Sequence, residues 1–174
     1  VKAVYSCLGP ILLALGLERM TGRSLARLFR DEIAEADSCR GARDEVLIGG
    51  VPPGTTRARI APTETGRRYE LERAGAAGHG QEIVPGPDRV LRGEVHDGNA
   101  AFMGGFTGNA GLFGTAHGVF VLASALSAPG PLLSARAWRR LAEPEPPRAD
   151  DVRTCGFQSG IAAGAPAGLL GPRS

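Results

Sequence analysis

Apolar residues recur at helical spacing in the first part of the chain. Between Leu8 and Met20 they form one such series, and Gly22 follows as a suitable C-terminal stop. Ser24 is placed to cap a second helix. The apolar stripe of that second helix consists of Leu25, Leu28, Phe29 and Ile33. The pattern predicts a helical hairpin within residues 1–36.

Glycine and proline interrupt the pattern every few residues in the region 37–98, so strands there should be short. The best strand candidates are Glu45–Val51 and Arg57–Ala61. Tyr69–Gly80 has the composition of a variable surface loop.

Helical patterning returns in the region 99–144, after a stretch of small residues and glycines at Asn99–Gly111. Thr115 and Ser134 are each placed to cap a helix, and these helices should end before Pro129 and Pro144. Residues 145–174 are rich in proline, glycine and alanine, and no regular element is expected there. We treat residues 1–174 as one partial domain with these four regions.

Composition narrows the class of protein. The 174 residues are 43% hydrophobic and 22% charged, which is typical of a globular chain. A net charge of +2 gives no reason to expect a nucleic-acid partner. No apolar run reaches the roughly 18 residues of a membrane span, so no transmembrane segment is predicted in this chain.

Metal and nucleotide sites are not predicted either. Three cysteines without a Cys-x-x-Cys pair and three histidines in separate segments do not match a metal-ligand pattern. The glycines of the chain match neither a phosphate-binding loop nor a dinucleotide fingerprint.

Two groups of motifs carry a more specific signal. The first is Tyr5-Ser6-Cys7-Leu8-Gly9, followed by an apolar helix and Thr21-Gly22. The second comprises Ile60-Ala61-Pro62-Thr63-Glu64, Gly93-Glu94-Val95-His96-Asp97 with Asn99-Ala100, and Gly104-Gly105 followed by Gly108 to Thr115. In order and spacing the two groups resemble the serine β-lactamase and penicillin-binding-protein-like family, in particular its esterase-like branch.

The resemblance implies an α/β protein with the β-lactamase/transpeptidase-like fold. This chain would supply mainly the helical domain and part of the antiparallel sheet. It also implies a serine hydrolase, an esterase or peptidase that forms an acyl-enzyme with a small ester, amide or peptide substrate. Such chemistry needs no cofactor.

The resemblance assigns roles to five residues. Tyr5 would be the catalytic general base and acid, although a lone tyrosine is more often a buried aromatic residue. Ser6 and Cys7 would lie at the substrate, with Cys7 where the family often has asparagine, whose amide is a better hydrogen-bond donor. Gly108 and Asn109 would belong to a substrate-binding rim, although tight packing explains this glycine-rich run equally well.

Two nearby groups have plainer interpretations. We expect His96 and Asp97 to tether a loop by hydrogen bonds rather than to form an acid/base pair. Arg136, Arg139 and Arg140 should form the solvated face of one short helix.

Two catalytic motifs of the family do not occur in these residues. Lys2 is the one lysine and no serine stands three positions before it, so there is no Ser-x-x-Lys, and no Lys-Thr-Gly or His-Thr-Gly occurs. We therefore expect an internal fragment of a serine hydrolase that is inactive by itself. The alternative is a non-catalytic homologue that serves as a binding or interaction module. The sequence does not distinguish an exported parent protein from a cytoplasmic one.

Overall fold

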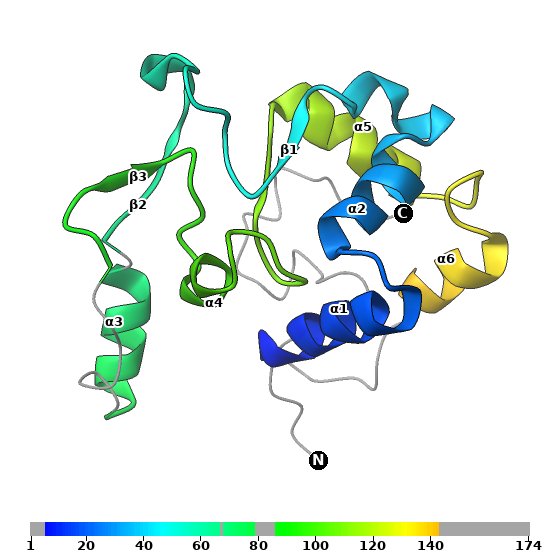
Figure 1. The fold of residues 1–174 in the computed structure, drawn as a ribbon. Coiled ribbons are helices and arrows are strands. Elements are labelled where there is room, and N and C mark those ends of the chain that lie inside the picture. The colour runs from blue at the N-terminus through cyan, green and yellow to red at the C-terminus, as the bar shows by residue number, and fades with distance from the viewer. Residues whose placement is uncertain (1–5, 67, 79–85, 143–174) are drawn as a thin grey trace, which may run out of the picture. The chain divides into compact units, whose positions relative to one another are not determined.

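A computed structural model describes residues 6–66, 68–78 and 86–142 (Figure 1). The chain divides into two compact units, Val1–Val121 and Leu122–Ser174. The described residues form a mixed α/β structure in which helices accompany two small antiparallel sheets.

The predicted helical hairpin is confirmed. Helix α1 spans Leu8–Thr21, and Gly22 ends it in the left-handed conformation with φ 67° and a hydrogen bond to the Glu18 carbonyl. Helix α2 spans Leu25–Phe29, and its Ser24 cap accepts a hydrogen bond from the Arg27 amide at 3.3 Å. A π-helical turn at Arg30–Ala34 and a 3₁₀ helix at Asp37–Ala42 continue the chain.

Both sheets pair strands that are distant in sequence. Strand β1 (Val46–Ile48) runs antiparallel to β4 (Leu112–Gly114), with Leu47 opposite Phe113. Strand β2 (Pro62–Thr65) runs antiparallel to β3 (Val90–Arg92), with a bulge between Pro62 and Glu64. The strand expected at Glu45–Val51 is confirmed for three of its residues, Val46–Ile48.

The strand expected at Arg57–Ala61 is wrong. Residues Arg57–Arg59 form a 3₁₀ helix, closed by the Arg59 amide on the Thr56 carbonyl at 2.9 Å. The strand starts later, at Pro62, because β3 offers a pairing edge only from there.

The loop expected at Tyr69–Gly80 is also wrong for most of its length. Helix α3 occupies Arg68–Ala76, and the last two residues of the expected loop lie outside the described residues. The Glu64 side chain supports the first turn by accepting a hydrogen bond from the Tyr69 amide at 2.6 Å. Glu70, within this helix, accepts from the Gly98 amide at 2.6 Å. The first bond uses a side chain outside the helix, and the second joins the helix to Gly98, which is distant in sequence. The composition of the segment therefore did not reveal the helix.

Three further helices complete the described chain: α4 (Gly98–Phe102), α5 (Ala116–Leu126) and α6 (Ala135–Ala142). The predicted caps of the last two are confirmed. Thr115 Oγ1 accepts from the Gly118 amide at 3.0 Å, and Ser134 Oγ accepts from the Ala137 amide at 3.2 Å. Helix α4 overlaps the start of the stretch of small residues and glycines at Asn99–Gly111, where no helix was predicted.

The buried apolar core of the described residues is small. It consists of Ile11, Ala14, Cys39, Ala42, Leu91 and Ala100. None of the helices in the described part is long and apolar enough to cross a lipid bilayer. The same part contains no group of three histidine, cysteine or acidic side chains that could hold a metal ion.

Candidate functional site

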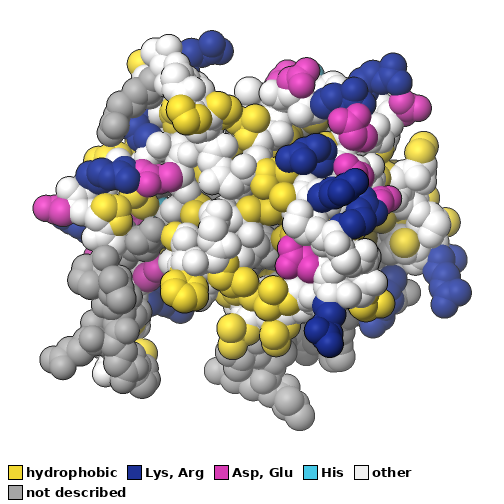
Figure 2. Space-filling model, viewed as in Figure 1, with side chains coloured by type: hydrophobic (Ala, Val, Ile, Leu, Met, Phe, Trp, Pro, Cys, Tyr) yellow, Lys and Arg dark blue, Asp and Glu magenta, His cyan; other side chains and the backbone are white. Residues whose placement is uncertain are grey.

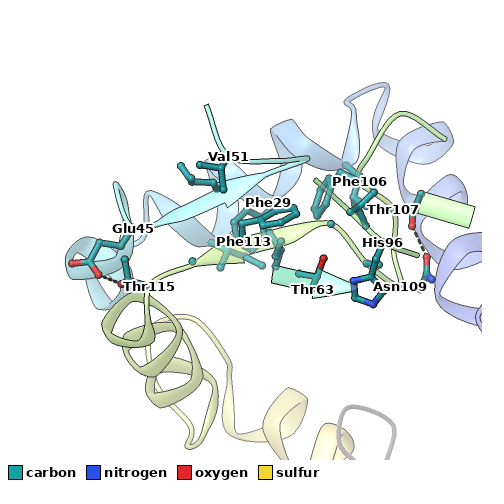
Figure 3. Close-up of a pocket in the computed structure, with 18 of the residues that line it drawn as sticks. Phe29, Glu45, Val51, Thr63, His96, Phe106, Thr107, Asn109, Phe113 and Thr115 are labelled. Carbon is teal, nitrogen blue, oxygen red and sulfur yellow. Dashed lines mark hydrogen bonds between the residues drawn. The ribbon is translucent and has the colours of Figure 1, made fainter. Parts of the chain in front are cut away.

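The first unit contains a broad cleft with a volume of about 1220 Å³ (Figure 3). Its apolar lining comes from α2 and the π-helical turn after it, from the β1–β4 sheet, from the segment between β1 and β2, and from the loop before β4. The main apolar side chains are Leu25, Leu28, Phe29, Ile33, Leu47, Val51, Ile60, Phe106 and Phe113. Each of these side chains is half-buried, so the cleft offers apolar surface that the described chain leaves unfilled.

Aromatic packing gives the middle of the cleft a defined wall. The rings of Phe29 and Phe106 lie edge to face, with centroids 6.3 Å apart and planes at 71°. This is one of the preferred arrangements of aromatic pairs. Figure 3 shows Phe29 and Phe113 between an end that carries Glu45 and Thr115 and an end that carries His96 and Asn109.

A hydrogen-bond network fixes Asn109 at its end of the cleft. Asn109 donates from Nδ2 to Asp97 Oδ2 at 3.0 Å and accepts at Oδ1 from the hydroxyl of buried Thr107. Asp97 also caps α4, since its Oδ1 accepts from the Ala100 amide at 2.8 Å. Asp97 therefore tethers the loop before β4, as expected, whereas His96 makes no side-chain hydrogen bond to the described residues.

The same loop packs closely against α1. A Cβ atom at Gly108 would overlap the carbonyl oxygen of Pro10 and would lie 3.0 Å from the Ala14 Cβ. A Cβ atom at Gly111, whose φ is 113°, would overlap the Gly105 carbonyl. Of the two explanations for the glycine-rich run, tight packing accounts for Gly108 and Gly111, and the run also lines the cleft.

At the opposite end, Glu45 joins β1 to the start of α5. Its carboxylate accepts hydrogen bonds from the Thr115 hydroxyl and interacts with His117 Nδ1 at 3.0 Å. The Thr115 amide donates to the Glu45 carbonyl at 3.1 Å. The hydrogen bond from Thr115, and then that of His117, hold the pKa of Glu45 below its ordinary value.

The structure places some of the predicted site residues together. Gly108 and Asn109 both line the cleft. Ser6 and Cys7 directly precede α1, where Ser6 Oγ accepts from the Leu8 amide at 3.2 Å, and neither residue lines the cleft. Tyr5 lies outside the described residues.

Sequence reasoning missed the aromatic wall and the Glu45 cluster. The stripe that contains Phe29 was interpreted only as a helix face, and Thr115 as a helix cap and the end of a motif. Glu45 and Thr115 are far apart in the chain, so only the β1–β4 pairing brings them together. The family resemblance concerned motifs and gave no information on these contacts.

Comparisons with models of protein families, with curated proteins and with solved structures found no match to this chain.

Proposed function

We propose that this chain is part of a β-lactamase-related serine hydrolase, an esterase or peptidase that acts through an acyl-enzyme intermediate. The proposal rests on the two groups of motifs named above, which occur in the family's order. The fold adds one supporting observation: segments from both groups are in contact. Gly108, in the second group, packs against Pro10, which lies one helical turn after the Tyr5-Ser6-Cys7 segment.

In this proposal Tyr5 moves the proton in both half-reactions. The oxygen of a nucleophilic serine attacks the substrate carbonyl, and Tyr5 takes the hydroxyl proton and passes it to the leaving group. In the second half-reaction Tyr5 takes a proton from water, which attacks the acyl-enzyme, and returns it to the serine. The nucleophile would come from a Ser-x-x-Lys segment outside these residues, because Lys2 is the one lysine here.

Covalent labelling tests the proposal. The complete product of the reading frame that encodes these residues is treated with a fluorescent fluorophosphonate and with a fluorescent penicillin. We expect labelling that disappears when the serine of an upstream Ser-x-x-Lys is changed to alanine and decreases strongly in Tyr5→Phe. A frame without that motif, or a folded product that never labels, contradicts the proposal.

Cys7 favours a second candidate, a non-catalytic homologue that serves as a binding module. A thiol is a poor hydrogen-bond donor compared with the asparagine amide that the family often has at this position. Changing Cys7 to Asn distinguishes the two candidates in the complete product. Faster labelling in Cys7→Asn supports a hydrolase with a weakened site, whereas no labelling in either form supports the binding module.

A further inference from the structure

The side chain of Asn109 is held in one orientation at the cleft. The Asp97 carboxylate only accepts hydrogen bonds, so the atom 3.0 Å from its Oδ2 is the amide nitrogen of Asn109. The amide oxygen then faces the Thr107 hydroxyl, which donates to it (Figure 3). Both partners are themselves anchored, since Asp97 caps α4 and the Thr107 amide donates to the Ala110 carbonyl at 2.9 Å. The amide of Asn109 is therefore fixed at both of its polar atoms.

One hydrogen-bond donor of this amide is unused. The amide nitrogen carries two N–H groups, and Asp97 accepts from one of them. The second N–H has no acceptor within residues 6–66, 68–78 and 86–142. Asn109 is half-buried and lines the cleft, so a carbonyl oxygen of a bound molecule is the kind of acceptor that this donor lacks.

An apolar wall belongs to the same loop as this donor. Phe106 lies three positions before Asn109, and both residues line the cleft. The ring of Phe106 packs edge to face against Phe29, which gives the wall its shape. Of the two predicted substrate-binding residues that line the cleft, Gly108 has no side chain, so a side-chain donor comes from Asn109.

We propose that Asn109 determines the specificity of the hydrolase by donating its second N–H to a non-reacting carbonyl of the substrate. The substrate class is an ester or amide that carries this second carbonyl next to an apolar group, which lies against Phe29 and Phe106. Asp97 is the positioning residue, because its carboxylate holds the nitrogen that donates. A donor that is fixed before binding loses little conformational freedom when the ligand arrives. The inference rests on the proposed function, since it takes the cleft as the place of the hydrolase's substrate.

Calorimetric titration of the 174-residue chain tests the donor without any reaction. The two probes, 4-oxo-4-phenylbutanoate and 4-phenylbutanoate, differ only by a carbonyl in place of a methylene group. We expect Asn109→Ala to weaken binding of the oxo acid about three- to tenfold, the range of one net hydrogen bond, and binding of 4-phenylbutanoate less than about twofold. Equal losses for the two probes, or no saturable binding of the oxo acid to the unaltered chain, overturn the inference.

Asp97→Asn tests the positioning role. The substituted side chain has one oxygen, so it can cap α4 or hold Asn109, but not both. We expect weaker binding of the oxo acid with a smaller effect on 4-phenylbutanoate, and a shift of the Asn109 side-chain amide signals in the magnetic-resonance spectrum of the isotope-labelled chain. Thermal unfolding shows that each variant is folded at the temperature of the titration.

The comparison of the two probes separates positioning from a general loosening of the fold, which would weaken both ligands alike. Asn99→Ala alters an exposed side chain of α4 and is the matched control, with no expected change in either affinity. Equal losses for both probes in Asp97→Asn, with unmoved Asn109 signals, overturn the positioning role.

Activity of the complete product separates this inference from the proposed hydrolase. The substrates are the p-nitrophenyl esters of the same two acids, and Asn109→Ala should lower kcat/KM about three- to tenfold more for the oxo ester than for its partner. Fluorophosphonate labelling with equal losses for the two esters supports the hydrolase and overturns the inference. Absence of labelling, with the oxo acid still bound through Asn109 by the 174-residue chain, contradicts the hydrolase and supports the donor.

Discussion

Asp97 performs two structural tasks with one carboxylate. One oxygen caps α4, and the other accepts a hydrogen bond from Asn109 in the loop that lines the cleft. A short helix such as α4 depends strongly on its cap, because it has few internal hydrogen bonds. The position of the loop and the existence of the helix are therefore coupled through one residue.

Removal of this carboxylate should destabilise the first unit. We expect Asp97→Ala to lower the free energy of unfolding by about 1–2 kcal/mol, since it removes a helix cap and leaves Asn109 without an acceptor. Denaturant unfolding followed by circular dichroism measures the change. Asn99→Ala is the control: it alters an exposed side chain of the same helix and should change stability by less than about 0.5 kcal/mol. Equal effects of the two changes would show that Asp97 has no special role.

Glu45 predicts how stability depends on pH. Its pKa is lowered in the folded chain from the ordinary 4.5, chiefly by the hydrogen bond from Thr115 and then by that of His117. The unfolded chain therefore binds the proton more readily. The stabilisation is present above the unfolded pKa and is lost as the pH falls through the lower folded value.

Thermal unfolding at a series of pH values below about 5 tests this dependence. The unfolding midpoint of the wild type should fall more steeply on acidification than that of Glu45→Gln, which cannot titrate at this position. Glu72→Gln, at an exposed position of α3, should follow the wild-type curve. Parallel curves for the wild type and Glu45→Gln would contradict the assignment.

At the scale of elements, the contact between α1 and the loop before β4 depends on the absence of a side chain at Gly108. The backbone of Pro10 occupies the space that a Cβ atom would need. Backbone yields less readily than the end of a flexible side chain, so even alanine requires the helix or the loop to move. By contrast, a Cβ atom at Gly16 within α1 would meet no atom within 4 Å.

A pair of glycine substitutions tests this contact. Gly108→Ala should lower the free energy of unfolding by about 1–3 kcal/mol through overpacking. Gly16→Ala should raise it by about 0.5–1 kcal/mol, because alanine restricts the unfolded chain and favours the helix. Chemical denaturation of both variants gives the comparison. A stable Gly108→Ala protein would mean that the loop does not rest on α1.

At the scale of the whole molecule, hydrophobic burial is incomplete along α1. Leu8, Leu12 and Leu13 are each more than 60% exposed, and Met20 is 84% exposed. Figure 2 shows apolar side chains gathered on the surface where α1 lies. A helix that is apolar nearly all round normally packs against other structure on several sides, and contiguous exposed apolar surface promotes association.

The exposed surface of α1 should make the chain bind hydrophobic dye and self-associate. We expect Leu12→Gln combined with Leu13→Gln to reduce the fluorescence of bound anilinonaphthalene sulfonate at least about twofold and to shift sedimentation toward the monomer. Arg19→Gln, on the same helix, should change neither measurement. Unchanged dye binding in the double variant would place the responsible apolar surface elsewhere.

Local sequence was sufficient to predict an element wherever that element is stabilised mainly by its own residues. The caps at Ser24, Thr115 and Ser134 were predicted because each hydroxyl accepts from an amide three positions later. The stop at Gly22 was predicted because glycine adopts a positive φ at little cost. The predictions of a strand at Arg57–Ala61 and of a loop at Tyr69–Gly80 were wrong, because pairing with β3 and the hydrogen bond that Glu64 accepts from the Tyr69 amide decide those segments.

The sequence by itself thus determined the helical hairpin, helices α5 and α6, and the motifs on which the proposed hydrolase rests. Only the tertiary structure decided which strands pair, how Asp97 holds Asn109, and which side chains line the apolar cleft. The physical reason is the separation along the sequence of the residues that make each contact. Helix caps and turns are formed by residues a few positions apart, whereas the cleft is formed by segments that chain folding brings together, and one-dimensional spacing does not encode their contacts directly.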